Sequence, residues 1–86
     1  HLDHSGYLPR LVKKGFRGSI FCTQVTAELI KVILEDSATL SDELDMPLYD
    51  LQDVQQTLKL IKPQNWNSEF EFLGMKAKLI PAGHIL

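Results

Sequence analysis

Two histidines and an aspartate stand together at the start of the sequence and could bind a metal ion. His1, Asp3 and His4 form the pattern His-x-Asp-His. Imidazole nitrogens and a carboxylate oxygen suit zinc or another divalent first-row metal. If a loop leads into a helix here, Asp3 and His4 face one point and His1 faces another close by, which suits two metals sharing a site. The alternative is structural: Asp3 caps a helix and both histidines are exposed.

The third histidine, His84, stands near the other end of the chain, after a strand-like segment. The dipeptide Ala82-Gly83 before it is small enough to allow other groups to approach closely. Taken alone, a histidine in this position is typical of a hydrogen-bonded core residue. The sequence contains no other histidine, so all three lie near the two ends of the chain. We therefore keep His84 as a further candidate ligand.

Length and composition exclude several classes of protein. The 86 residues carry nine basic and eleven acidic side chains, a formal net charge of −2. This fits one small domain or part of a larger one, and it disfavours a generic nucleic-acid coat protein. The longest stretch without charge, Gly18 to Ala27, is half of the roughly 20 residues that a membrane helix needs. A single cysteine, Cys22, excludes an intrachain disulfide and fits a reducing, cytoplasmic setting. The chain starts without Met, and we interpret it as a piece of a longer protein.

The first half of the chain predicts a helix, a strand and a second helix. Residues 5–14 have the helical spacing of an apolar stripe made of Leu8, Leu11 and Val12. Gly15 is expected to end this helix as its C′ residue. Residues 18–22 are an apolar, β-rich run typical of a buried strand. Thr23 then caps a helix whose predicted inner face carries Val25, Leu29, Val32 and Ile33. The acidic stretch 35–45 predicts a solvated loop or helix end.

The second half predicts a helix and a hairpin. Asp50 is expected to cap the helix, with Asp53 in its first turn, and Pro63 to end it. The predicted buried stripe of this helix consists of Leu51, Val54, Leu58 and Ile61. Residues 69–72 and 75–79 alternate with period two around Gly74, which indicates a hairpin with one buried and one solvated face. The order is helix, strand, helix, helix, strand, strand, an α/β arrangement.

Several other side chains allow a functional and a structural interpretation. One stripe of basic side chains could contact an RNA backbone or form a solvated helix face: Arg10, Lys13, Lys14 and Arg17. Tyr49 and Trp66 could stack on bases. We expect Tyr49 instead to pack beside the Asp50 cap and Trp66 to lie in a partly exposed loop. Cys22 is expected to be a small core residue.

The order and spacing of several motifs resemble one family over essentially the whole chain. His1 to Pro9 (HLDHSGYLP) resembles the second half of the H-x-H-x-D-H signature of the metallo-β-lactamase fold superfamily, with its following helix. The other matching segments are similar to its RNA-processing branch, the β-CASP nucleases: residues 15–23, 26–29, 34–38, 47–49 with 53–54, and 82–86. That branch contains bacterial RNA-processing exonucleases and the cleavage-and-polyadenylation endonuclease.

The resemblance implies a fold and a set of ligands. The fold would be part of an αβ/βα metallo-β-lactamase sandwich, with residues 1–86 a partial domain truncated at both ends. His1 and His84 would bind one zinc ion, and Asp3 and His4 the other. Asp3 would also act in catalysis by orienting the attacking water or accepting its proton. The first histidine of the signature, a bridging aspartate, a later histidine and the β-CASP cap would lie outside these residues.

The resemblance also implies a function for the parent protein, a metal-dependent hydrolase. It would be a zinc-dependent ribonuclease that hydrolyses phosphodiester bonds of an RNA substrate with a metal-bridged hydroxide. We expect no membrane association, and the parent could form a homo-oligomer. The 86 residues alone are expected to bind metal poorly and to be inactive. Two alternatives remain: a hydrolase of a thioester or lactone with the same metal site, and a non-catalytic scaffold subunit that retains the fold.

Overall fold

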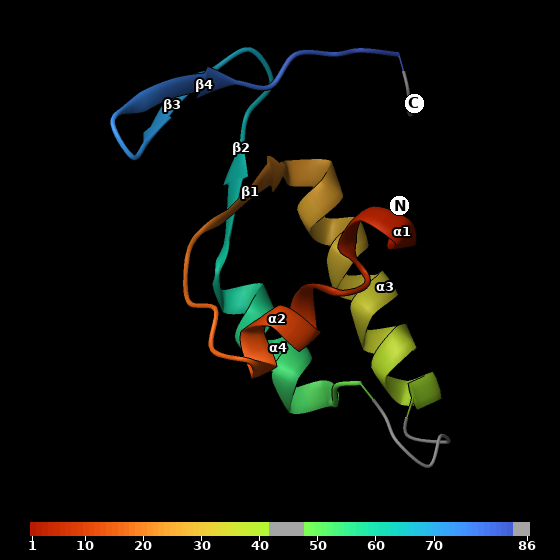
Figure 1. The fold of residues 1–86 in the computed structure, drawn as a ribbon. Coiled ribbons are helices and arrows are strands. Elements are labelled where there is room, and N and C mark those ends of the chain that lie inside the picture. Colours follow the sequence, from red (N-terminus) through yellow and green to blue (C-terminus); the bar gives the residue numbers. More distant parts are fainter. Residues whose placement is uncertain (42–47, 84–86) are drawn as a thin grey trace.

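The computed structural model describes residues 1–41 and 48–83 and shows a mixed α/β arrangement (Figure 1). Two short helices, α1 (Leu2–Ser5) and α2 (Leu8–Lys13), precede strand β1 (Ile20–Thr23). The long helix α3 (Gln24–Ser41) follows, and α4 (Leu51–Lys59) leads into strand β2 (Ile61–Gln64). Strands β3 (Glu69–Phe72) and β4 (Met75–Lys78) complete the order. None of the helices in the described ranges has the length and apolar character that a membrane span requires.

The predicted first helix is in fact two helices. α1 ends at Ser5, and α2 begins at Leu8 with Tyr7 as its N-cap. Pro9 therefore lies in the first turn of α2, where its missing N–H has no helical partner to lose. Within the predicted stripe Val12 is buried, whereas Leu11 is 47% exposed, so that part of the prediction is wrong.

Gly15 ends α2 as predicted. Its φ of +114° lies in the region that side chains with a Cβ disfavour. The Gly15 N–H donates to the carbonyl of Val12 and the Phe16 N–H to that of Leu11, both at 3.0 Å. This is the Schellman pattern, and it satisfies carbonyls that the helix end would leave unpaired.

The core lies between α3 and α4, and it uses a different face of α3 from the predicted one. The buried apolar side chains in this cluster are Ile30, Leu34, Ala38, Tyr49 and Val54. The predicted inner residues Val25, Leu29 and Val32 are 52–66% exposed, and Ile33 is half-buried. α3 carries two apolar stripes, and its spacing alone does not reveal which of them contacts α4. Glu35 and Asp36, predicted as loop or helix end, lie inside α3, and residues 42–45 of that acidic stretch lie outside the described ranges.

Helix α4 begins as predicted and ends earlier. Asp50 accepts a hydrogen bond from the Asp53 N–H (2.9 Å), and the Asp53 carboxylate accepts one from the Asp50 N–H (3.0 Å), forming a capping box. Of the predicted stripe, Val54 is fully buried and Leu58 half-buried, but Leu51 is 47% exposed. Ile61 lies beyond the helix, in β2.

Strands β1 and β2 form a parallel pair, of which only β1 was predicted from the sequence. Ile20 pairs with Ile61 and Cys22 with Pro63. We expected Pro63 to end a helix, but it lies inside β2, where its missing N–H is tolerated because β2 pairs with a single strand among the described residues. The pairing joins segments about 40 residues apart, and the short sequence Ile-Lys-Pro-Gln gives no strong local signal for it.

The hairpin of β3 and β4 confirms the predicted alternation, but its apolar face is not buried as predicted: Phe70 and Ala77 are half-buried, and Phe72 and Met75 are exposed. Leu73 and Gly74 both have positive φ, 51° and 76°, as a two-residue type I′ turn requires. The paired residues put charged side chains on one face and apolar side chains on the other. Phe70 and Phe72 lie with their ring centroids 4.9 and 5.4 Å from that of Phe21 on β1. The hairpin, which projects at one end of the molecule in Figure 1, is thereby anchored to the β1–β2 pair.

The capping box predicts a pH dependence of stability. The backbone hydrogen bond from Asp53 is the main cause that holds the pKa of Asp50 below its ordinary 3.8. A carboxyl with a lower pKa in the folded chain stabilises it above the unfolded pKa, and that stability is lost as pH falls through the folded pKa. We therefore expect unfolding to become easier on acidification below about pH 4. Asp50→Asn should lose less, because asparagine caps a helix without titrating. Urea unfolding of both forms at neutral and acidic pH measures this; equal acid losses would contradict it.

Candidate metal centre

The three residues predicted as ligands at the start of the chain lie together in the structure. One ligand atom each from His1, Asp3 and His4 can be chosen so that all three lie within 4.8 Å of one another. His4 Nε2 lies 3.5 Å from Asp3 Oδ2, and the two imidazole centroids are 6.2 Å apart. All three residues are exposed, so a cation and a substrate have access to them from solvent.

Helix α1 explains why these side chains meet. His1 is its N-cap and His4 is three residues further on, which places both on the same side of a helical turn. Asp3 lies inside the first turn, so the structural alternative is wrong about the Asp3 cap, but its expectation that both histidines are exposed is confirmed. The turn is tight: the Gly6 N–H donates to the Leu2 carbonyl at 2.6 Å, and a Cβ on Gly6 would lie 2.8 Å from that oxygen. A glycine is therefore required where α1 ends.

A groove of about 830 Å³ runs beside this cluster. His1 and His4 line it together with residues of α3 and with the segment 80–83 that follows β4. Figure 1 shows this last segment running toward the side of the molecule where α1 lies. Gly83 lines the groove, and the next residue, the predicted ligand His84, lies outside the described residues. The two ends of the described chain therefore converge on one groove.

The donor set fits a first-row divalent cation. Two imidazoles and one carboxylate are ligands that zinc takes in proteins. Zinc is four-coordinate as a rule, so three side chains can hold one ion with an open position but cannot enclose two ions. Cys22 also lines the groove, but burial raises the pKa of its thiol and it does not belong to the ligand cluster. As predicted, it packs against the core.

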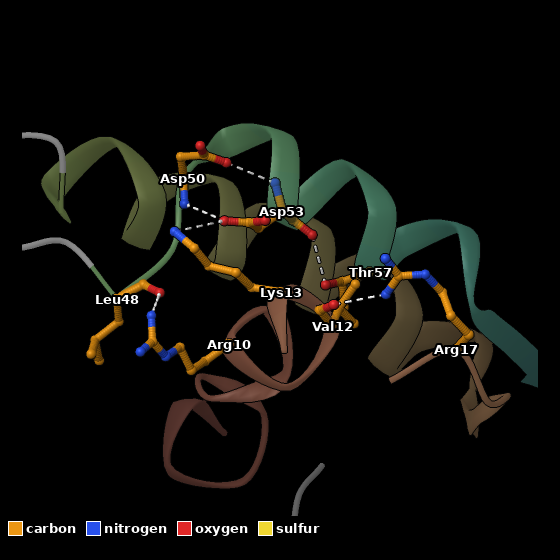
Figure 2. Close-up of polar contacts among 8 residues, drawn as sticks. All are labelled: Arg10, Val12, Lys13, Arg17, Leu48, Asp50, Asp53 and Thr57. Carbon is orange, nitrogen blue, oxygen red and sulfur yellow. Dashed lines mark hydrogen bonds and ion pairs between the residues drawn. The ribbon is translucent and has the colours of Figure 1, made fainter. Parts of the chain in front are cut away.

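The basic stripe holds α2 in place (Figure 2). Arg10 Nη1 donates to the Leu48 carbonyl (2.9 Å), and Lys13 Nζ lies 3.8 Å from the Asp53 carboxylate. Arg17 Nη1 donates to the carbonyls of Val12 and Phe16, at 2.7 Å each. Three of the four basic side chains therefore have partners within the chain. These contacts favour a structural role over RNA binding, and they fix α2, and with it the preceding α1, against α4.

The two aromatic residues that could stack on bases differ in their surroundings. Tyr49 is buried, and its hydroxyl lies 2.8 Å from Ser37 Oγ, so it packs beside the Asp50 cap as predicted. Trp66 is 50% exposed in the loop before β3, also as predicted. Trp66 lines the same groove as His1 and His4, which could not be predicted from the sequence because it depends on packing between distant segments.

Comparison with known proteins identifies relatives over the full chain. No family model matches it. Ribonuclease TTHA0252 of Thermus thermophilus is 32% identical over 85 residues, 99% of this chain and 19% of the relative. Transcription termination factor FttA of Cenarchaeum symbiosum is 34% identical over 88 aligned residues, covering 100% of this chain and 14% of the relative. Cleavage and polyadenylation specificity factor 73 of Drosophila melanogaster is 32% identical over 88 aligned residues, 100% of this chain and 13% of the relative.

The chain spans 11–20% of the length of these and similar relatives, so the match covers one segment of much longer proteins. Proteins named as endoribonucleases from several fungi match over the same extent, at 30–34% identity. Matches of this kind across a bacterium, archaea and eukaryotes confirm that the sequence resembles the RNA-processing branch predicted from its motifs. The chain is homologous to a segment of the β-CASP RNA-processing nucleases.

Proposed function

We propose that the protein containing this chain is a zinc-dependent RNA-processing nuclease, and that the chain forms part of the αβ/βα sandwich of its metallo-β-lactamase domain. One observation carries the proposal: the ligand atoms of His1, Asp3 and His4 lie within 4.8 Å of one another in a chain homologous to ribonucleases. Exposed acidic groups are common in proteins that bind no metal, so the assignment of this cluster to a metal site depends on the homology.

The residues would share the work between binding and catalysis. His1 would hold one zinc ion together with His84, and Asp3 and His4 would hold the second. Bound zinc would lower the pKa of a water molecule, and it would place positive charge next to the phosphodiester. The Asp3 carboxylate, 3.5 Å from His4 Nε2, would orient the water or accept its proton. Two ligands for each ion leave both zinc ions incompletely coordinated, so we assign the activity to the whole protein and expect the 86 residues alone to be inactive.

The comparisons favour RNA over the two alternatives. A thioester or lactone hydrolase would need the same ligands, but the matched relatives carry names of ribonucleases and RNA-processing factors. A non-catalytic scaffold would need none of the ligands, yet three of them are present and close together. A cytoplasmic location and a homo-oligomeric state remain predictions.

Turnover of two substrates by the full-length protein tests this proposal. We expect cleavage of an RNA oligonucleotide, loss of cleavage after treatment with a chelator, and recovery on addition of zinc. A thioester should not be hydrolysed at a comparable rate. Turnover of the thioester but not of RNA would replace the nuclease assignment, and turnover of neither in the zinc-loaded protein would favour the scaffold.

A further inference from the structure

Ser5 differs from the three ligand residues beside it in being buried. Ser5 is 6% exposed, whereas Asp3 and His4 in the same turn of α1 are exposed. α1 packs against α3, and Ser5 lines the groove together with His1 and His4. A buried hydroxyl needs a hydrogen-bond partner. The hydrogen-bond partner of the Ser5 hydroxyl therefore shows which group this side chain holds in place.

The Ser5 hydroxyl donates to the carbonyl oxygen of His1 at 3.0 Å. The same oxygen accepts the N–H of His4, also at 3.0 Å. α1 is a single turn, too short to hold its shape through backbone hydrogen bonds alone. The side-chain bond adds a second constraint on the His1 carbonyl. It therefore restricts the direction in which the His1 side chain leaves the backbone.

We propose that Ser5 is a positioning residue of the metal centre: its hydroxyl holds His1 so that the imidazole stays within reach of Asp3 and His4. This inference rests on the proposed function, because it assumes that the cluster binds zinc. Groups that orient metal ligands typically change metal affinity by 10–100-fold when they are removed. Because His1 keeps its bond from the His4 N–H, we expect Ser5→Ala to weaken zinc binding by about tenfold, at the lower end of that range.

Thr57 supplies a matched control. It is also buried, and its hydroxyl also donates to a carbonyl four residues earlier, that of Asp53, at 2.8 Å. It lies on α4 and does not line the groove. Thr57→Val therefore removes the same kind of bond without touching the ligand cluster. Ser5→Thr is the rescue variant, since threonine in a helix can donate to the same carbonyl.

The experiment measures the dissociation constant of Zn²⁺ by competition with a chromophoric chelator, on the full-length protein and these three variants. We expect weaker binding for Ser5→Ala, wild-type binding for Thr57→Val and recovery of most of the affinity in Ser5→Thr. Wild-type affinity in Ser5→Ala, or an equal loss in Thr57→Val, would overturn the positioning role while leaving the proposed function intact. A wild-type protein that binds no zinc would overturn both.

Discussion

Replacing Asp3 by asparagine is expected to lower the turnover of RNA by the full-length protein by about 10²–10⁴-fold, the range in which a positioned acid or base contributes. Asparagine keeps the size of the side chain but loses the negative charge and the ability to accept a proton. Because Asp3 is exposed on a short helix, its replacement should leave folding unchanged. Initial rates on an RNA oligonucleotide at saturating zinc give the measurement.

Asp36→Asn is the control for this change. Asp36 is exposed on α3 and does not belong to the ligand cluster, so the same chemical change there should leave turnover at the wild-type level. An Asp3→Asn protein that cleaves RNA as fast as the Asp36→Asn protein would remove Asp3 from the mechanism. The circular dichroism spectra of both variants should match that of the wild type.

Replacing Leu34 by alanine is expected to lower the free energy of unfolding of the domain that contains this chain by about 2–5 kcal/mol, the usual cost of truncating a buried leucine. Leu34 is fully buried in the core between α3 and α4. A single domain has only about 5–15 kcal/mol of stability, so this loss would be a large fraction of the total. Urea unfolding followed by circular dichroism measures it.

Leu29 on the same helix provides the matched comparison. It is 52% exposed, so Leu29→Ala should change the free energy of unfolding by no more than about 0.5 kcal/mol. The pair of variants distinguishes the observed core face of α3 from the face that sequence spacing predicted. A larger loss in Leu29→Ala than in Leu34→Ala would show that the predicted face is the buried one after all.

Features with a local chemical cause could be predicted from the sequence. The Asp50 cap depends on a side chain three residues from its partner, and the turn at Gly74 depends on a glycine that accepts positive φ. The proximity of His1, Asp3 and His4 belongs to the same class, because the three residues lie within one helical turn. In each case the residues that interact are neighbours in the sequence.

Features that depend on distant partners could not be predicted. The choice between two apolar stripes on α3 is made by contact with α4, and the strand at Pro63 exists through pairing with β1. The burial of Ser5 likewise depends on packing of α1 against α3. The position of His84 relative to the cluster stays a prediction, although Gly83 before it lines the same groove as His1 and His4.

The zinc content of the full-length protein tests the central claim most directly. We predict about two zinc ions per chain in the wild type after dialysis against zinc and removal of the excess. The His4→Ala variant should retain less zinc, because it removes one imidazole of the ligand cluster. A wild-type protein that holds no zinc, or a His4→Ala variant that keeps the full complement, would contradict the assignment of His1, Asp3 and His4 as a metal centre.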